Sequence, residues 1–326
     1  MSAVVFPAEW EPHRAMLMEF PVFWKSGDIA AARRSYAEVA RTIACFEPVT
    51  MIATPENADL ARELCGETVE VLPLPHDDAW ARDNCPTFVK TSGGALAAIN
   101  WHFNAWGGKY PTWELDNAVP QRLCDLWGIP RTDAPIVLEG GSIHTNGAGT
   151  LLTTSECLLN PNRNPAHTPS EIERVLREHL GLERVIWLPF GVDGDETDGH
   201  VDNICCFIGE NTALIQWTDD TRDPNHARCR ADAAVLASHG VAIEKITAPP
   251  AIYSGDERLT ASYVNFVFTN GGLVIPAFGG IAAEADAAAL AKMRALFPNR
   301  EVVAVNTLEI LKGGGNIHCV TQQIPA

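Results

Sequence analysis

The sequence predicts an α/β fold, and two observations indicate this class. Four helical segments alternate along the 326 residues with clusters of short, strand-like apolar runs. Polar or glycine-rich stretches also interrupt the strands about once every 60 residues, as in a repeated unit, near Trp80, Glu139, His200, Tyr263 and Cys319. Repeats around an axis would bring these loops to a common centre, whereas a solenoid would spread them along a surface, and the spacing alone leaves both arrangements open.

The predicted helices have recognisable boundary signals. Asp28 is a candidate N-cap in front of an amphipathic apolar stripe. A second helix has a start signal at Thr168, followed by proline, and a stop signal at Gly181. The four helices are expected at residues 28–46, 168–181, 224–239 and 284–297.

The strand-like runs are short and lie between these helices. Asn146-Gly147 is a strong turn signal and predicts a hairpin within residues 137–154, after a Glu-Gly-Gly turn. The strands are expected at residues 49–53, 149–154, 203–208, 212–217, 262–268, 272–278 and 301–306.

The composition describes an ordinary soluble globular chain with a large core, at 46% hydrophobic and 20% charged residues. No linker, low-complexity tract or block of like charges divides it, so we expect one catalytic domain over residues 1–326. A formal net charge of −17 argues against a nucleic-acid partner. It suits a small cationic substrate, or an acidic surface that only aids solubility.

The nine cysteines form neither a small disulfide framework nor paired CxxC zinc spacing. Cys205 and Cys206 lie next to each other within an apolar run, as core residues do. The N-terminal apolar stretch is too short for a signal peptide, and no run is long enough to cross a membrane. We therefore expect a reducing, cytoplasmic setting and no membrane partner.

The segment KGGGNIHCVTQQIPA, residues 312–326, carries the strongest chemical signal. Three glycines allow the backbone to approach a ligand closely just before a single cysteine, Cys319. This placement is typical of a nucleophile surrounded by backbone N–H groups. The alternative is a buried strand cysteine that follows a surface turn.

Four other polar residues stand at strand ends or beside glycine turns: Asp83, Glu139, His200 and Asp202. His200 and Asp202 are two residues apart, so on a strand both side chains would point to one face. Structural roles are the alternative, with Asp83 in a turn or N-cap, Arg82 as its ion-pair partner, and His200 as a buried structural histidine.

Together these residues suit a guanidinium substrate. Two carboxylates can bind the planar, permanently charged group bidentately and hold its central carbon still. A thiolate is a suitable nucleophile for this poor electrophile, and a bound cation favours the thiolate form. His200 would protonate the departing amine and then activate water.

Nine segments make the chain resemble the agmatine deiminase family of guanidine-modifying enzymes. The resemblance implies a five-bladed α/β propeller (pentein) of ββαβ units, and cofactor-free, metal-free hydrolysis of agmatine to N-carbamoylputrescine and ammonia, a step toward putrescine. The segments are PAEWEPH (7–13), WARDNCPTF (80–88), HFNAWGG (102–108), LEGGSIH (138–144), LLNPNRNP (158–165), TDGHVDN (197–203), QWTDD (216–220), ASYVNF (261–266) and GGGNIHC (313–319).

The family's catalytic roles transfer residue by residue. The resemblance makes Cys319 the nucleophile that forms an amidino-cysteine intermediate, His200 the general acid/base, and Glu139 the residue that orients it. Asp83 and Asp202 become the guanidinium ligands. It implies a homodimer or larger assembly, and the further substrate contacts are expected at Trp80, Asp198 and Gly315.

Some residues depart from the family pattern. We expect them to shape the part of the pocket that holds the end of the substrate opposite the guanidinium. Cys85 replaces a glycine, and Asn146 and Ala148 replace two carboxylates. The segments 19–28, 191–199 and 251–258 also differ in sequence or are shorter. The acidic residues available for a terminal ammonium are Asp195, Glu196 and Asp198.

Three other functions stay open on the sequence alone. The first is a deiminase for arginine or peptidyl arginine. The second is a metal-dependent amidohydrolase, which would leave Cys319 without a role and would use His144, Glu139, His200 and Asp202 as ligands. The third is a binding protein for a cationic amine without catalytic activity.

Overall fold

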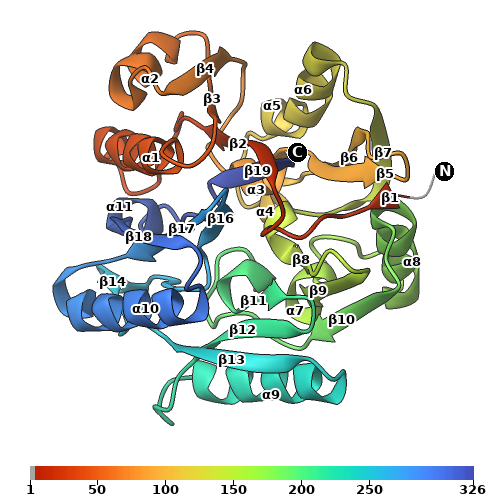
Figure 1. The fold of residues 1–326 in the computed structure, drawn as a ribbon, viewed down its shortest axis with the longest axis vertical. Coiled ribbons are helices and arrows are strands. Elements are labelled where there is room, and N and C mark those ends of the chain that lie inside the picture. Colours follow the sequence, from red (N-terminus) through yellow and green to blue (C-terminus); the bar gives the residue numbers. More distant parts are fainter. Residues whose placement is uncertain (1–3) are drawn as a thin grey trace.

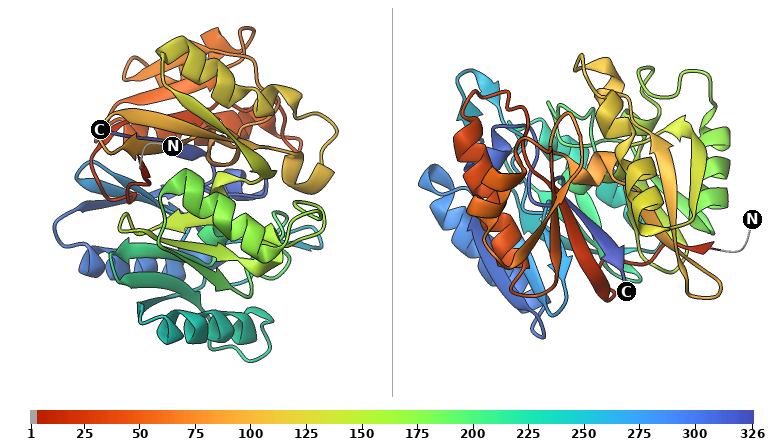
Figure 2. Two further views of the ribbon diagram at one scale, coloured as in Figure 1. Left: turned by 90° about the vertical axis from the view of Figure 1, so that its right-hand side faces the viewer. Right: turned by 90° about the horizontal axis from the view of Figure 1, so that it is seen from above.

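A computed structural model describes residues 4–326 and confirms the α/β class. In Figure 1 the sheets follow one another around the middle of the molecule, and the long helices lie at the outside. The two views of Figure 2 show the same separation of helices from the central strands. None of the helices within residues 4–326 is long and apolar enough to cross a membrane.

Each of the five larger sheets formed by the described residues combines an antiparallel strand pair with a parallel strand. The sheets consist of β5 (Thr87–Thr91), β6 (Leu96–His102) and β7 (Arg131–Val137), with β1 (Val4–Val5) at the edge; β8 (Ile143–Thr145), β9 (Thr150–Thr154) and β10 (Arg184–Leu188); β11 (Cys205–Gly209), β12 (Thr212–Trp217) and β13 (Ala242–Thr247); β16 (Val267–Thr269), β17 (Gly272–Ala277) and β18 (Glu301–Asn306); and β19 (Thr321–Pro325), β2 (His13–Glu19), β3 (Val49–Ala53) and β4 (Val69–Pro73).

A helix joins the two parallel strands in each of these sheets, which gives a recurring β–β–α–β unit. These helices are α1 (Ile29–Ile43), α6 (Val119–Trp127), α8 (Pro169–Leu180), α9 (Asn225–Ser238) and α10 (Ala283–Leu296). In the last unit β19, near the C-terminus, pairs antiparallel with β2, near the N-terminus. The first and last parts of the described chain therefore share one sheet.

The remaining elements are short. They are α2 (Ala58–Cys65), α3 (Ala81–Asn84), α4 (Ala105–Gly108), α5 (Glu114–Asn117), α7 (Ser155–Leu158), α11 (Leu308–Leu311), the 3-10 turns η1 (Gly140–Ser142), η2 (Val201–Asn203) and η3 (Gly280–Ala282), and a ribbon of β14 (Tyr253–Ser254) with β15 (Glu257–Arg258).

The helix signals read from the sequence are confirmed. The Asp28 side chain accepts a hydrogen bond of 2.9 Å from the backbone N–H of Ala31 at the start of α1. Thr168 and Glu171 form a reciprocal capping box at the start of α8. Gly181 ends that helix with φ = 70°, a left-handed conformation that glycine adopts at little cost.

The strand predictions are confirmed for most segments, and two of them are wrong in part. Within residues 262–268 only the end is a strand, because the Asn265 side chain accepts hydrogen bonds from the backbone N–H groups of His318 and Cys319. His200 and Asp202 do not lie on a strand, because residues 201–203 form η2 and β11 begins only at Cys205. Their common direction therefore comes from a tight turn.

The five polar stretches spaced along the sequence have a common place in the fold. Each lies directly before the first strand of one antiparallel pair, that is, before β5, β8, β11, β16 or β19. The interval noted in the sequence therefore marks one β–β–α–β unit. The predicted core residues Cys205 and Cys206 are buried, as expected.

Candidate active site

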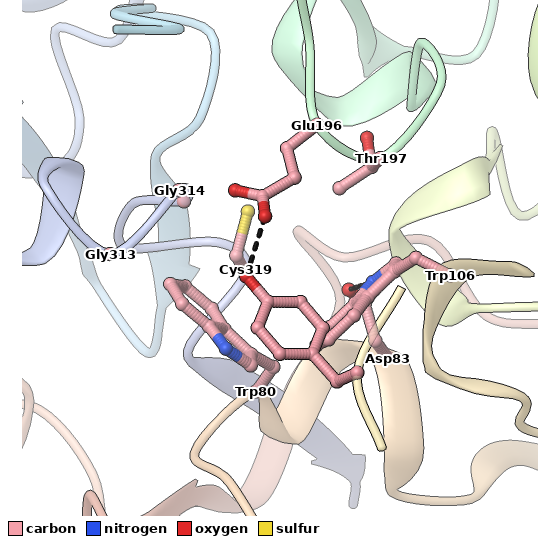
Figure 3. Close-up of a pocket in the computed structure, with 10 residues that line it drawn as sticks. Trp80, Asp83, Trp106, Glu196, Thr197, Gly313, Gly314 and Cys319 are labelled. Atoms are coloured by element: carbon pink, nitrogen blue, oxygen red, sulfur yellow. Dashed lines mark hydrogen bonds between the residues drawn. The ribbon is translucent and has the colours of Figure 1, made fainter. Parts of the chain in front are cut away.

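A pocket collects residues from several of these stretches and from the loops beside them (Figure 3). Cys319 and Asp83 lie at its inner end, and Trp80 and Trp106 are part of its wall. The complete lining consists of Trp80, Asp83, Trp106, Tyr110, Glu196, Thr197, Gly313, Gly314, Gly315 and Cys319. Of the substrate contacts expected from the sequence, Trp80, Asp83 and Gly315 therefore line the pocket, whereas Asp202 is not among the lining residues.

The Cys319 thiol is held from two directions. The Asn265 side-chain amide donates to Sγ at 3.1 Å, and Sγ lies 3.5 Å from Oδ2 of Asp202. Burial and the negative charges of Asp202 and Asp83 raise the pKa of the thiol well above its usual value. Without a cation in the pocket, Cys319 is therefore a thiol.

Asn265 is a site residue that the sequence analysis did not single out. It lies in the irregular stretch before β16 and also donates to Oδ1 of Asn203 at 3.0 Å. The segment ASYVNF was noted for its resemblance alone, and an asparagine in an apolar run carries no local sign that its partner lies 54 residues away.

His200 lies fully buried between two carboxylates. Nδ1 is 3.7 Å from Oδ1 of Asp83, and Nε2 is 3.5 Å from Oε2 of Glu139. Burial alone lowers the pKa of His200, but Asp83, Cys157 and Glu139 outweigh it and raise the pKa well above the usual value. His200 is therefore a proton donor at neutral pH.

Asp83 is held by neutral donors. Nε1 of Trp106 donates to Oδ2 at 2.9 Å, and the backbone N–H of Gly141 donates to Oδ1 at 3.0 Å. Burial raises the pKa of Asp83 to about 6, against the opposing effect of His200. Arg82 is not its partner, because that guanidinium is paired with Glu9 at 3.2 Å.

Asp202 uses one oxygen and leaves the other free. Oδ2 lies 2.9 Å from Nδ1 of His318, whereas Oδ1 has no hydrogen-bond partner within residues 4–326 and is shielded from solvent. Burial raises the pKa of Asp202, but His318, His200 and Arg82 together outweigh burial and lower the pKa below its usual value. A buried acceptor without a partner is suited to a donor from a bound cation.

Gly141 shows how closely these groups converge. A Cβ atom added there would lie 2.6 Å from Nδ1 of His200, 2.9 Å from Oδ2 of Asp202 and 2.9 Å from Oδ1 of Asp83. The absence of a side chain at this position is what allows the imidazole and both carboxylates to share one small volume. The structure therefore brings together His200, Asp83 and Asp202 as the sequence analysis expected.

Gly141→Ala is expected to lower kcat/KM by about 100-fold or more, because misplacing reacting groups by about 1 Å has costs of this size. Steady-state ammonia release is the measurement, with circular dichroism to check folding. Gly209→Ala is the matched control, since the nearest atom to its added Cβ is 3.9 Å away. Normal activity in Gly141→Ala would contradict the convergence of these groups.

Glu139 faces His200 and is itself fixed by an arginine. Its Oε1 accepts from Nε of Arg163 at 2.7 Å, and both side chains are completely buried. Burial raises the pKa of Glu139, but Arg163 and His200 outweigh it and lower the pKa below the usual value. Glu139 is thus placed as an ionised partner for the His200 ring.

Asp198, expected to contact substrate, does not line the pocket. Its carboxylate is paired with Lys109 at 2.8 Å and with Arg163 at 2.5 Å. Asp195 is also directed elsewhere, since it accepts from the Asn203 side chain at 3.2 Å. Of the three acidic residues considered for a terminal ammonium, Glu196 alone belongs to the pocket lining.

The Glu196 carboxylate lies across the pocket from Asp83, where Figure 3 shows its bond with Tyr110. It accepts from Tyr110 at 2.5 Å and from Nζ of Lys25 at 2.5 Å. Lys25 also contacts Glu257 of the β14–β15 ribbon at 3.2 Å. The divergent segments 19–28 and 251–258 therefore meet at Lys25, beside this carboxylate.

The single-residue departures noted in the sequence lie outside the pocket lining. Asn146 stabilises the hairpin turn, because its Oδ1 accepts from the backbone N–H groups of Ala148 and Thr150, each at 2.9 Å. Cys85 is buried, with its sulfur 3.9 Å from Glu19. Cys85, Asn146 and Ala148 therefore do not form part of the pocket wall.

The metal ligands considered above are not brought to one place. Within residues 4–326 two groups have the composition of a metal site, one of Glu9, His144 and His318 and one of Glu139, Cys157 and His200. His144 belongs to the first group, whereas Glu139 and His200 belong to the second. In the first group Nδ1 of His144 accepts from the backbone N–H of Phe207, so Nε2 carries the proton and faces Glu9 as a donor.

The chain is similar to known deiminases in both sequence and structure. A sequence model of the Porphyromonas-type peptidyl-arginine deiminase family matches residues 5–325. The chain is 44% identical to the agmatine deiminase of Stutzerimonas stutzeri (strain A1501), over 98% of this chain and 95% of that protein. It superposes on the solved structure of the Enterococcus faecalis agmatine deiminase with a TM-score of 0.92 and 31% identity, covering 99% of this chain and 96% of the other. A substrate-bound serine variant of the C. jejuni agmatine deiminase gives a TM-score of 0.92 with 29% identity and the same coverage.

Proposed function

Because this chain belongs to the agmatine deiminase family, we propose that it is an amidine hydrolase that converts agmatine and water to N-carbamoylputrescine and ammonia. One observation carries the assignment of the substrate. A single pocket holds Cys319 and Asp83 at its inner end and the Glu196 carboxylate across from them. Agmatine has a guanidinium at one end and an ammonium at the other, so it complements both ends of this pocket.

The first half of the proposed reaction forms a covalent intermediate. Asp83 and the free Oδ1 of Asp202 bind the guanidinium, whose positive charge promotes loss of the Cys319 thiol proton to solvent. Sγ then forms a bond to the central guanidinium carbon. His200 donates its proton to the departing nitrogen, the C–N bond breaks and ammonia leaves. An amidino-cysteine (thiouronium) group remains on Cys319.

The second half hydrolyses this intermediate. His200, now neutral, accepts a proton from water as the water oxygen bonds to the same carbon. The C–S bond then breaks as the hydroxyl proton of the adduct passes to the departing sulfur, which releases the carbamoyl product and restores the Cys319 thiol. Glu139 keeps the imidazole oriented in both steps, because it is itself fixed by Arg163.

Glu196 is proposed to receive the terminal ammonium of agmatine. Its carboxylate is already paired with Lys25 and hydrogen-bonded to Tyr110, so the substrate ammonium would share it with one lysine. A guanidine with a neutral alkyl tail gains nothing from this carboxylate. This difference separates agmatine from other guanidines in an experiment.

The test is ammonia release from agmatine, butylguanidine, arginine and a peptidyl arginine, by the native protein and by Glu196→Gln. We expect agmatine to be the best substrate. The substitution should raise KM for agmatine by about 10-fold or more and leave butylguanidine within about twofold, because only agmatine loses a charge partner.

Glu173→Gln is the control, since that residue is on α8 and is paired with Arg177. Faster ammonia release from arginine or peptidyl arginine would assign the protein a guanidine substrate other than agmatine. No ammonia from any of the four compounds would reject deimination. An equal rise in KM for agmatine and butylguanidine would show that Glu196 does not contact the substrate ammonium.

We also propose that residues 1–326 form one catalytic domain with the family's five-bladed propeller arrangement. The five β–β–α–β units support this, because each unit begins with a stretch that supplies a residue to the site: Asp83, Glu139, His200, Asn265 or Cys319. The homodimer expected from the family and the cytoplasmic location expected from the cysteines belong to the same proposal. No nucleic acid, membrane or cofactor has a role in it.

A further inference from the structure

A buried row of charged side chains lies behind the pocket. Arg82 donates to Oε1 of Glu9 at 3.2 Å, and the same oxygen lies 2.9 Å from Nε2 of His318. Nδ1 of His318 lies 2.9 Å from Oδ2 of Asp202. All four side chains are at most 6% exposed. The row therefore connects the N-terminal segment to the proposed guanidinium ligand without contact with solvent.

The geometry determines the charge of His318. Each ring nitrogen lies 2.9 Å from an oxygen of Glu9 or Asp202, and both carboxyl groups have a lowered pKa, so each nitrogen donates a hydrogen bond to a carboxylate. A neutral imidazole has one donor, and only the imidazolium has two. Glu9 and Asp202 accordingly raise the pKa of His318, against burial and Arg82. The row then contains two cations and two anions and is neutral as a whole.

Other groups near the row do not change this balance. His144 faces Glu9 with Nε2 at 3.5 Å, but its Nδ1 accepts a backbone N–H, so it is a neutral donor. On the far side, Asp202 faces His200 and the Cys319 sulfur. Asp202 is thus the member of the row that meets the reacting groups.

We propose that His318 is a positioning residue for deimination: as an imidazolium anchored by Glu9, it holds Asp202 ionised and turned so that Oδ1 is free for the guanidinium. This inference rests on the proposed function. His318 occupies one oxygen of Asp202, and the other is the one without a partner within residues 4–326. Glu9 in turn keeps the ring from rotating, and His318 and Arg82 lower the pKa of Glu9 against burial and keep it ionised. The N-terminal segment PAEWEPH (7–13), through Glu9, thereby contributes to substrate binding without contacting the substrate.

A purely structural role for the row makes a different prediction. If the four charges only stabilise packing, loss of His318 would lower the melting temperature and leave the kinetics of the folded protein unchanged. If His318 positions Asp202, its loss raises the pKa of Asp202, since the nearby cation that favours the carboxylate is removed. Asp202 would then be protonated at a higher pH than in the native protein. Agmatine binding would therefore weaken first at the acidic end of the pH range.

The experiment compares His318→Gln with the native protein over about pH 3.5 to 9. We expect KM for agmatine to rise about 10-fold or more and kcat to change less. The acid limb of kcat/KM should move up, because one buried charge partner commonly shifts a carboxyl pKa by 1–3 units. Glu9→Gln, in which the imidazole remains but loses its anchor, should change the same parameters in the same direction and by less. His179→Gln is the matched control, since His179 is also buried but bonds to a backbone carbonyl in α8.

Three further measurements make the outcome decisive. Isothermal calorimetry of agmatine in a Cys319→Ala background, with and without His318→Gln, measures binding even if turnover is lost. Thermal melting separates misfolding from a kinetic effect. If His318→Gln does not fold, the kinetics of Glu9→Gln provide the test instead. ¹⁵N NMR of histidine-labelled native protein at pH 7 should show His318 with both ring nitrogens protonated.

Two results would overturn the role of His318. One is a neutral His318 at pH 7, and the other is a folded variant with native KM and acid limb. An inactive native protein would instead reject the proposed function, and the NMR result would still report on the row. The two failures are therefore distinguishable.

Discussion

Cys319→Ala is expected to lower ammonia release from agmatine by about 10⁴-fold or more while the dissociation constant for agmatine stays within about fivefold, as for other enzymes that lose a covalent nucleophile. The sulfur supplies the bond to the guanidinium carbon. The carboxylates of Asp83, Asp202 and Glu196 remain to hold the cation. Single-turnover kinetics and calorimetry measure the two quantities separately.

Cys229→Ala is the matched control for this substitution. Cys229 is likewise buried, but it lies on α9, where its sulfur contacts the His226 carbonyl at 3.5 Å. It should retain native turnover. Mass spectrometry of the native protein quenched during turnover should also show an adduct on the peptide that contains Cys319. Native turnover by Cys319→Ala would reject the covalent mechanism.

Asp202→Asn is expected to affect binding and rate together, with kcat/KM lower by about 10²- to 10³-fold, since removing one partner of a buried charge pair costs about 2–5 kcal/mol. The amide places a neutral group against the guanidinium. It also removes the acceptor shared by His318 and Cys319, which lie 2.9 and 3.5 Å from Oδ2. Steady-state kinetics with agmatine, together with calorimetry, measure the effect.

Asp232→Asn provides a chemically matched comparison. Asp232 is a buried residue of α9, and burial raises its pKa to about 8, so it is mostly protonated at pH 7 and an amide imitates its state. We expect near-native activity from this variant. Unchanged KM and kcat in Asp202→Asn, measured beside it, would refute Asp202 as a guanidinium ligand.

The boundaries of the helices followed from the sequence because their causes are local. The Asp28 cap, the Thr168 capping box and the Gly181 stop each involve groups within four residues of one another. The Asn146-Gly147 hairpin was predicted for the same reason. The strand at 262–268 was largely wrong, since Asn265 bonds to backbone groups more than 50 residues away.

The choice among three neighbouring acidic residues shows a second kind of limit. The sequence identified Asp195, Glu196 and Asp198 as candidates, and Asp198 was expected to contact substrate. In the folded chain Asp198 is neutralised by Lys109 and Arg163, whereas Glu196 is part of the pocket wall. Residues in an irregular loop have no fixed periodicity, so their directions depend on distant partners.

By itself the sequence determined the α/β class, the chemical types needed for guanidine chemistry and the resemblance to one enzyme family, because these depend on residue type and local spacing. Only the tertiary structure decided which oxygen of Asp202 is free, that Glu196 lines the pocket, and that Glu9 is joined to His318. Glu9 and His318 are 309 positions apart. Pairs of this kind form only when the first and last parts of the chain share a sheet, and no local pattern records them.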